Sequence, residues 1–248
     1  MKVAIVTGCA SQVGIGFATA TRLATEGWSV ALIDCAADPL REAAAVIASQ
    51  NDVDTLPLVC DVTSADDVNR TVDLALKHFG RLDALVNNAG ITAPTRFADI
   101  TEAEWERIFA VDIKGVFLMT RAALPRMREQ RYGRIVNVSS VAAKRGGGIV
   151  GGVHYAAAKA AVLGFTKALA REVAAEGITC NAVAPGLIDT EIAGGLAEER
   201  RQALIADIPV GRLGRKEEVA AAITFLCSDG ASYITGEEID INGGSHID

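Results

Sequence analysis

Short runs of β-branched and other apolar residues alternate along the chain with longer segments of helical pattern. Seven of these runs predict strands: Val3 to Thr7, Ser29 to Ile33, Thr55 to Cys60, Leu82 to Val86, Arg134 to Val138, Ile178 to Val183 and Glu238 to Ile241. Several are apolar at nearly every position, as expected for strands covered on both faces, and helix-length segments separate them. The pattern therefore predicts a doubly wound α/β fold, with a seven-stranded parallel sheet and helices on both faces.

The composition fits one domain over residues 1–248, in which hydrophobic residues make up 50% of the chain and the formal net charge is -7. A nucleic-acid partner is not expected, because the chain has no basic excess. The sequence has no apolar run of about 18 residues and no signal-peptide pattern, which predicts a cytoplasmic location and no membrane partner. The five cysteines lie singly, without the spacing of a zinc site, and are interpreted as small buried residues.

Two irregular segments are candidates for loops over a site. The glycine-rich stretch from Arg145 to Gly152 lies between a predicted strand and a predicted helix, which indicates a loop. A second stretch, from Pro185 to Gly195, follows the sixth strand at the sheet edge where doubly wound folds bind ligands. We expect an irregular substrate lid over about 186–208, although an ordinary surface loop has the same composition.

The first predicted strand runs into a glycine-rich turn and then a helical pattern. The turn is Thr7-Gly8-Cys9-Ala10-Ser11-Gln12-Val13-Gly14-Ile15-Gly16. Glycine allows the backbone to approach a pyrophosphate closely, and the free N–H groups at a helix start favour its negative charge. A tight strand-to-helix turn without a ligand would use the same glycines, so the motif needs further support.

Asp34 gives that support, because it follows the second strand at about the offset from Gly16 at which an acid binds the adenosine ribose. A carboxylate at this place would repel a 2'-phosphate, and no Arg stands at 35–37 to attract one. The predicted cofactor is therefore NAD rather than NADP. The alternative is that Asp34 is a solvated turn residue.

Tyr155 and Lys159 are candidates for proton chemistry. They open an alanine-rich helix, and their separation of four places the phenol and the ammonium on one face. The cation favours the phenolate, which allows Tyr155 to exchange a proton with substrate. Ser139 and Ser140 end the preceding strand and offer hydroxyl donors to a carbonyl oxygen that gains charge. Such a Tyr-Lys pair is common on helix surfaces, so its meaning depends on these neighbours.

The chain resembles the short-chain dehydrogenase/reductase family over essentially its full length. The motifs that carry the resemblance are Thr7-Gly8 to Gly16, Asp61-Val62, Asn87-Asn88-Ala89-Gly90, Ser140, Tyr155 with Lys159, Pro185-Gly186 with Thr190, Ile234-Thr235-Gly236, and Asp240-Ile241-Asn242-Gly243-Gly244. The resemblance implies a Rossmann-type oxidoreductase that transfers a hydride directly between a substrate carbon and the nicotinamide, without a metal.

The family arrangement also implies roles for individual residues. Tyr155 would be the general acid/base, Lys159 would bind the nicotinamide ribose and Ser140 would hydrogen bond to the substrate oxygen. Asp61 and Val62 would hold the adenine. The full set of candidate cofactor contacts is Gly8, Ser11, Gly14, Ile15, Asp34, Asp61, Val62, Asn88, Ala89, Gly90, Tyr155, Lys159, Pro185, Gly186, Ile188 and Thr190, of which Ile188 and Thr190 would bind the carboxamide.

Three departures from the family pattern affect this site. Five residues rather than three separate Gly8 from Gly14, which leaves open which loop residues touch the pyrophosphate. Ser140 lies 15 positions before Tyr155 rather than 13, an extra length that the glycines between them would absorb, and Ser139 remains the alternative. Asp112 stands where the family usually has an asparagine that supports a water. We include Asp112 among the catalytic candidates, because it would hold a water, strengthen the pairing of Lys159 or alter the pH optimum.

Other residues have plain structural interpretations. His154 is expected to be a loop or rim residue that points away from the tyrosine. Trp28 and Trp105 are expected to be packing groups. Lys144 and Arg145 are expected to form a solvated loop, with contact to an anionic substrate as the alternative.

The leading functional hypothesis is reversible, NAD-dependent oxidation of a secondary alcohol to its ketone. Sugars or polyols are preferred, because the Val141 to Tyr155 segment loosely resembles polyol-oxidising members. The Ile208 to Gly214 segment also resembles 3-oxoacyl-thioester (acyl-carrier-protein) reductases, which generally prefer NADPH, so Asp34 argues against that alternative. A catalytically weak NAD-binding scaffold or regulator is the alternative from another class.

The resemblance further implies a homotetramer. The apolar faces of the helical segments Ala103 to Met119 and Ala156 to Val173 would pack between subunits. The same faces would also fit burial within one chain, so the sequence supports this only weakly.

Overall fold

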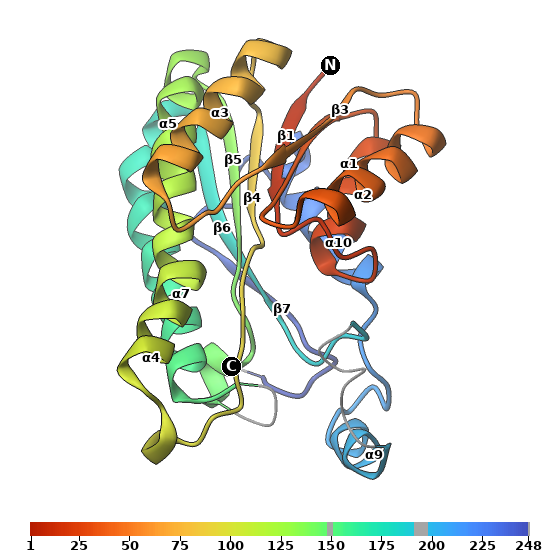
Figure 1. Cartoon of the computed structure of the whole chain (residues 1–248), viewed down its shortest axis with the longest axis vertical. Coiled ribbons are helices and arrows are strands. Elements are labelled where there is room, and N and C mark those ends of the chain that lie inside the picture. Colours follow the sequence, from red (N-terminus) through yellow and green to blue (C-terminus); the bar gives the residue numbers. More distant parts are fainter. Residues whose placement is uncertain (148–150, 191–197, 248) are drawn as a thin grey trace.

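The seven predicted strands are present and lie in one parallel sheet. The computed structural model describes residues 1–147, 151–190 and 198–247. The strands are β1 (Val3–Thr7), β2 (Ser29–Asp34), β3 (Thr55–Val59), β4 (Ala84–Asn87), β5 (Gly133–Val138), β6 (Ile178–Pro185) and β7 (Glu238–Ile241). Their order across the sheet is β3-β2-β1-β4-β5-β6-β7, and every neighbouring pair is parallel (Figure 1). The prediction of a doubly wound fold is confirmed, with the winding direction reversing between β1 and β4.

Helices cover both faces of this sheet (Figure 1). One face carries α1 (Ile15–Thr25), α2 (Ala37–Gln50) and α10 (Lys216–Cys227), and the other carries α3 (Ala65–Phe79), α5 (Gly115–Gln130) and α7 (Val153–Val173). Shorter elements are η1 (Phe97–Asp99), α4 (Glu102–Phe109), the π-helical turn η2 (Ala110–Lys114), α6 (Ala142–Arg145), η3 (Ala174–Glu176), α9 (Glu198–Ala206) and η4 (Asp229–Ala231). Because α6 and α9 follow β5 and β6, they lie at the carboxyl edge of the sheet, where the candidate residues are.

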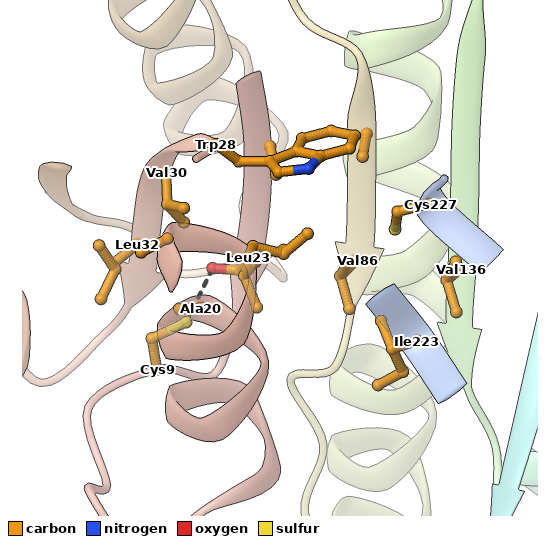
Figure 2. Close-up of a cluster of buried hydrophobic side chains, with 14 of the residues drawn as sticks. Cys9, Ala20, Leu23, Trp28, Val30, Leu32, Val86, Val136, Ile223 and Cys227 are labelled. Carbon is orange, nitrogen blue, oxygen red and sulfur yellow. Dashed lines mark hydrogen bonds between the residues drawn. The ribbon is translucent and has the colours of Figure 1, made fainter. Parts of the chain in front are cut away.

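The core lies on both sides of the sheet, as the apolar strands require. Val6 of β1 packs with the α1, α2 and α10 side, whereas the preceding Ile5 packs with the α3, α5 and α7 side. This is the two-residue alternation of a strand, here with both faces buried. Trp28 lies in the first cluster beside Leu23, which confirms it as a packing group (Figure 2).

The cysteines divide into a buried group and one exposed residue. Cys9, Cys60, Cys180 and Cys227 are buried, and burial raises the pKa of the Cys227 thiol to about 12. Cys35 is exposed, so the interpretation of all five as buried residues is wrong for this one. Cys35 directly follows the last residue of β2 and therefore stands at the carboxyl edge of the sheet.

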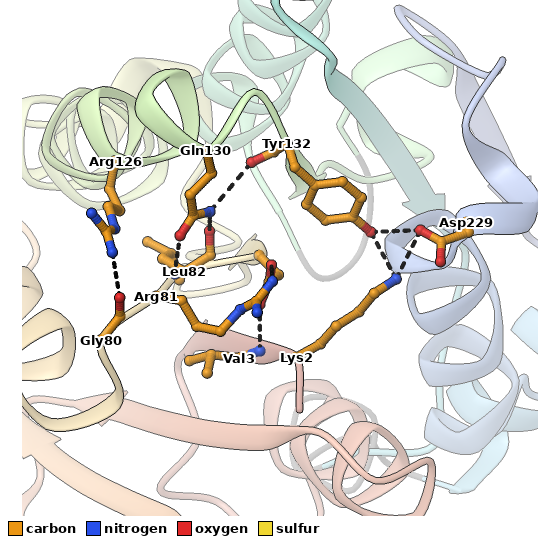
Figure 3. Close-up of polar contacts among 10 residues, drawn as sticks. Lys2, Val3, Gly80, Arg81, Leu82, Arg126, Gln130, Tyr132 and Asp229 are labelled. Carbon is orange, nitrogen blue, oxygen red and sulfur yellow. Dashed lines mark hydrogen bonds and ion pairs between the residues drawn. The ribbon is translucent and has the colours of Figure 1, made fainter.

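Side chains join the strands at the opposite, amino-terminal edge of the sheet (Figure 3). Lys2 Nζ donates hydrogen bonds to the Tyr132 hydroxyl at 2.9 Å and to Asp229 Oδ1 at 2.8 Å. Gln130 bonds to both backbone groups of Leu82, with its Oε1 accepting from N at 3.1 Å and its Nε2 donating to O at 2.6 Å. The side chain of Gln130 thus pairs the backbone groups of Leu82, which lies outside β4, because this strand begins at Ala84 and not at the predicted Leu82.

One predicted loop contains a helix. The sequence led us to expect an irregular lid over about 186–208, but α9 forms at Glu198–Ala206, where good helix formers such as Glu, Arg, Gln, Ala and Leu are concentrated. The expectation of an irregular segment is wrong for that part. Residues 191–197 of the predicted lid, and residues 148–150 of the glycine-rich loop, lie outside the described residues.

Candidate active site

The glycine turn after β1 is held open toward the carboxyl edge of the sheet. Gly8 has a φ of 72°, in the left-handed region that favours glycine, and its N–H donates to Ile33 O at 2.8 Å. A Cβ on Gly16 would lie 2.1 Å from Gly8 O, so only glycine lets α1 approach the turn this closely. Sequence reasoning left Gly16 out of the candidate contacts, although it belongs to the motif, because its role is packing between backbone segments.

The start of α1 has the features of an anion site. Gly14 is the N-cap residue and has no side chain to bond the first N–H groups of the helix. Those groups and the helix dipole favour a negatively charged ligand. The Gly14 N–H donates to Ser11 O at 2.9 Å. This bond forms a turn within the five residues that separate Gly8 from Gly14. The residues present therefore fit the pyrophosphate of a dinucleotide.

Asp34 lies beside this turn. Its Oδ2 accepts a hydrogen bond from the Ala10 N–H at 3.0 Å, and its Oδ1 accepts one from the Ala36 N–H at 3.1 Å. A carboxylate has about four acceptor positions, so both oxygens keep capacity for a ligand hydroxyl. Asp34 thus organises the glycine turn, a role that its place at the end of β2 did not reveal.

A cavity of about 340 Å³ opens next to the turn and collects most of the candidate residues. The candidates that line it are Gly8, Ser11, Gly14, Ile15, Asn88, Gly90, Ser140, Tyr155, Lys159, Pro185, Gly186, Ile188 and Thr190. They come from the glycine turn, from the ends of β4, β5 and β6, and from α7. The sheet order makes this possible, because the carboxyl ends of parallel strands meet at one edge.

Asp34, Asp112 and three further candidates lie outside the cavity lining. Asp61 is exposed, and its Oδ1 accepts hydrogen bonds from both the N–H and the hydroxyl of Thr63. Val62 is buried against Gly115 of α5, where a Cβ would lie 3.0 Å from a Val62 methyl carbon. Ala89 donates its N–H to Thr7 Oγ1 at 2.9 Å. The structure therefore does not bring these three residues into the cavity lining.

Two serines end β5, and their hydroxyls have different partners. Ser139 Oγ donates to Lys159 O at 2.9 Å, so this hydroxyl ties β5 to α7. Ser140 Oγ accepts a hydrogen bond from the Ala142 N–H at 3.1 Å, which leaves its own O–H available as a donor. Both serines line the cavity that Tyr155 lines, so the difference lies in their hydroxyl partners. The geometry therefore favours Ser140 as the donor to a substrate oxygen.

Lys159 is held by two fixed acceptors beneath the cavity. Its Nζ donates to Val138 O at 3.0 Å and lies 3.2 Å from Asp112 Oδ2, and it sits 5.8 Å from the centre of the Tyr155 ring. Both charged side chains are buried, with 5% of Lys159 and 0% of Asp112 exposed. Burial lowers the pKa of Lys159, but the charge and hydrogen bond of Asp112 outweigh it, so the pKa is raised. The ammonium therefore keeps its charge.

Asp112 reaches this position from η2, the π-helical turn before α5. Its Oδ1 accepts a hydrogen bond from the Ile91 N–H at 2.9 Å, and its Oδ2 faces Lys159. Of the alternatives that the sequence left open, the geometry supports the pairing with Lys159. A π-bulge is common at functional sites and here turns the carboxylate inward.

His154 and Lys144 differ from expectation. His154 is fully buried, with Nε2 3.2 Å from Glu104 Oε1, so the prediction of a rim residue is wrong. Lys144 is only 11% exposed and its Nζ lies 2.8 Å from Asp240 Oδ2, so it joins α6 to β7 and is not a solvated loop residue. Trp105 stacks on Phe109 at a ring separation of 4.6 Å while remaining 37% exposed.

A second cavity of about 330 Å³ adjoins the first at Ser140, Gly186 and Leu187. Its wall combines apolar side chains with an Arg and an Asp, and includes Val141, Arg145, Leu204, Asp207, Ile208 and Ser245.

Within 1–147, 151–190 and 198–247, no helix is long and apolar enough to cross a membrane, and no three His, Cys, Asp or Glu side chains are grouped to hold a metal.

The fold and this arrangement define a dinucleotide-binding oxidoreductase, and comparisons with known proteins give the family. A family model described as enoyl-(acyl carrier protein) reductase matches residues 8–246. A short-chain type dehydrogenase/reductase of Sinorhizobium fredii is 44% identical over 99% of this chain and 98% of its own. A 3-oxoacyl-[acyl-carrier-protein] reductase of Aquifex aeolicus is 42% identical over 98% and 96%. The crystal structure of levodione reductase matches with a TM-score of 0.93 and 36% identity, over 98% of this chain and 96% of that one. The chain belongs to the short-chain dehydrogenase/reductase family.

Proposed function

We propose that the protein catalyses reversible, NAD-dependent hydride transfer between a secondary alcohol and its ketone. The observation that carries the proposal is the meeting of Ser140, Tyr155 and Lys159 around one cavity that also borders the glycine turn. When bound, the cofactor would give or take the hydride at its nicotinamide carbon C4. The nicotinamide end would lie toward Ile188 and Thr190, and Lys159 would hold the adjoining ribose.

The protein's own side chains would handle the proton. In ketone reduction, the Tyr155 hydroxyl would donate its proton to the substrate oxygen as that oxygen gains charge, and in alcohol oxidation it would take the proton back. Ser140 would donate a hydrogen bond to the same oxygen, which stabilises the developing charge. Lys159, fixed by Val138 and Asp112, would place a permanent positive charge beside the phenol.

The preference for NAD is proposed on Asp34. Its carboxylate lies beside the glycine turn, where a 2'-phosphate would meet a negative charge. Comparing NAD with NADP in wild type and in Asp34→Ala tests this part separately. We expect the variant to lose affinity for NAD and to accept NADP better in relative terms. An unchanged preference in Asp34→Ala would remove Asp34 from the argument.

For the substrate we propose a compact hydroxylated metabolite, such as a sugar or polyol. The second cavity, of about 330 Å³, lies directly beside Ser140, and polar groups of Arg145, Asp207 and Ser245 line it, which suits hydroxyl groups. Reduction of a 3-oxoacyl thioester is the second candidate. The reductases of Aquifex aeolicus at 42% identity and Thermotoga maritima at 43% support it, since each spans nearly all of this chain.

The test is a spectrophotometric assay of purified protein, with NAD or NADP and a panel of polyols, and with NADH or NADPH and a 3-oxoacyl thioester. We expect NADH to form with at least one polyol and Tyr155→Phe to abolish this turnover. Faster turnover of the thioester with NADPH would favour the second candidate. Tight NAD binding without turnover of any substrate would favour a scaffold or regulator.

The assembly and location remain proposals as well. Phe117 of α5 and Trp105 of α4 are 42% and 37% exposed, large apolar groups on the segment expected to pack between subunits. They support a homotetramer. A cytoplasmic location remains an expectation from the sequence.

A further inference from the structure

His154 stands immediately before Tyr155 but is fully buried, and its imidazole has partners on both sides. The Tyr155 backbone N–H donates to His154 Nδ1 at 3.0 Å, and His154 Nε2 lies 3.2 Å from Glu104 Oε1 of α4. The Thr95 hydroxyl donates to the same Glu104 oxygen at 2.6 Å. The hydrogen bond from Thr95 has the larger effect on the pKa of Glu104 and the one from His154 the smaller, and both lower it. The Glu104 carboxylate therefore remains a hydrogen-bond acceptor.

The hydrogen bonds fix the form of the imidazole. Nδ1 of His154 accepts a hydrogen bond from a backbone N–H, so it carries no proton. The proton of the neutral ring is therefore on Nε2, which donates to Glu104. Three groups that come from a loop, from α4 and from α7 thus form one chain that ends at the backbone of Tyr155.

This chain replaces a missing helix cap. Tyr155 is the third residue of α7. The backbone N–H at this position usually donates a hydrogen bond to the side chain of the N-cap residue. The N-cap residue here is Gly152, which has no side chain to do so. A Cβ on Gly152 would lie 2.6 Å from Thr95 O, because the loop packs directly against the helix start. The close packing leaves no room for a side chain at Gly152. His154 Nδ1 therefore supplies the acceptor for the Tyr155 N–H.

The ring of Tyr155 has little freedom at the same place. A Cβ on Gly151 would lie 2.3 Å from Tyr155 Cδ1 and 3.0 Å from Thr92 Oγ1. Thr92 lines the cavity, and the Gly152 N–H donates to Ala93 O at 2.7 Å. A rotation of the first turn of α7 would therefore move the phenol relative to the cavity wall.

We propose that His154 is a positioning residue for Tyr155, held in register by Glu104 and Thr95. The inference rests on the proposed function, because it assigns the phenol of Tyr155 the proton transfer. His154 does not touch substrate. It fixes the first turn of α7, and with it the distance between the phenol and the substrate oxygen. A misplacement of about 1 Å in an active site costs up to about a hundredfold in rate.

His154→Ala removes the acceptor, and His154→Asn offers Oδ1 in place of Nδ1. We expect His154→Ala to lower kcat about tenfold to a hundredfold, with little change in the Kd for NADH, and His154→Asn to recover most of the loss. Thr95→Val, at a half-buried position, should lower kcat by a smaller factor. The matched control is Thr166→Val on the same helix, because Thr166 is buried and accepts from Asn137 Nδ2 at 2.9 Å. It should reduce Tm but leave kcat unchanged.

A wild-type kcat in His154→Ala would overturn the proposal, as would a His154→Asn variant no better than His154→Ala. If Thr166→Val lost as much kcat as His154→Ala, the loss would reflect general destabilisation of α7, and the proposal would be overturned as well. If wild type turns over no substrate, the proposed function fails by itself. Amide hydrogen exchange at 153–156 then decides the positioning: faster exchange in His154→Ala than in His154→Asn supports it, and equal exchange refutes it.

Discussion

Asp112→Asn tests the role of the buried carboxylate, because it removes one charge with almost no change in shape. In the wild type, Asp112 Oδ2 and Lys159 Nζ are 3.2 Å apart, and neither side chain is more than 5% exposed. With an effective dielectric constant of about 20, their attraction is about 5 kcal/mol. Desolvation of the two ions offsets several kcal/mol of that attraction.

The expected loss of stability is smaller than for removal of the whole side chain. Asparagine retains an oxygen that accepts from the Ile91 N–H, and Lys159 retains its bond to Val138 O. Removing one member of a buried pair usually costs about 3–5 kcal/mol, and these retained bonds reduce our expectation to about 2–3 kcal/mol at neutral pH. Urea unfolding monitored by circular dichroism measures the difference.

The pH dependence gives a second readout. Because the folded-state pKa of Lys159 is raised above its ordinary value of 10.5, the stabilisation is fully present below that value. It disappears as the pH rises through the folded-state pKa. The gap in stability between wild type and Asp112→Asn should therefore narrow in the alkaline range above 10.5.

Catalysis should change in a defined direction. At a pH where Lys159 is still protonated without the Asp112 carboxylate, its positive charge is less compensated and favours the phenolate of Tyr155 more strongly. Alcohol oxidation should then reach half of its maximal rate at a lower pH. The matched control is Asp83→Asn, a second fully buried aspartate, which binds the Val3 N–H at the far edge of the sheet. It should lose stability but retain the wild-type pH profile. An unshifted profile in Asp112→Asn, or an equal shift in Asp83→Asn, would refute the reasoning.

Two further predictions concern the cofactor site and the assembly. Cys35 is exposed and follows Asp34, so a bulky maleimide should label one of the five thiols in the native protein, as counted by mass spectrometry, and NAD should slow that labelling. Labelling at the same rate with saturating NAD would contradict an adenosine site beside Asp34. One chain has a mass of 25.9 kDa, and light scattering should give four times that mass for the wild type. Phe117→Glu, at an exposed position of α5, should lower the measured mass. A wild-type mass near one chain would disprove the homotetramer.

The fold was predictable because its strands are buried on both faces and therefore stand out in the sequence as apolar runs. The strand ends were less predictable. β4 starts later than predicted, and the backbone of Leu82 pairs instead with the side chain of Gln130, 48 residues away, which the local pattern does not reveal. The interpretation of His154 was wrong for a related reason. Helical spacing shows that His154 and Tyr155 point in different directions, but it contains nothing about Glu104, which lies 50 residues earlier and provides the buried partner.

The Asn88-Ala89-Gly90 segment illustrates how the family resemblance identified residues without giving their physical roles. Asn88 Nδ2 donates to Thr7 O at 2.9 Å, so this side chain joins the end of β4 to the glycine turn after β1. At Gly90, a Cβ would lie 3.0 Å from Lys159 Nζ and 3.3 Å from Asp112 Oδ2. A side chain there would press on the buried ion pair. Because this position is a glycine, the ammonium of Lys159 and the carboxylate of Asp112 have room directly beside the backbone of Gly90.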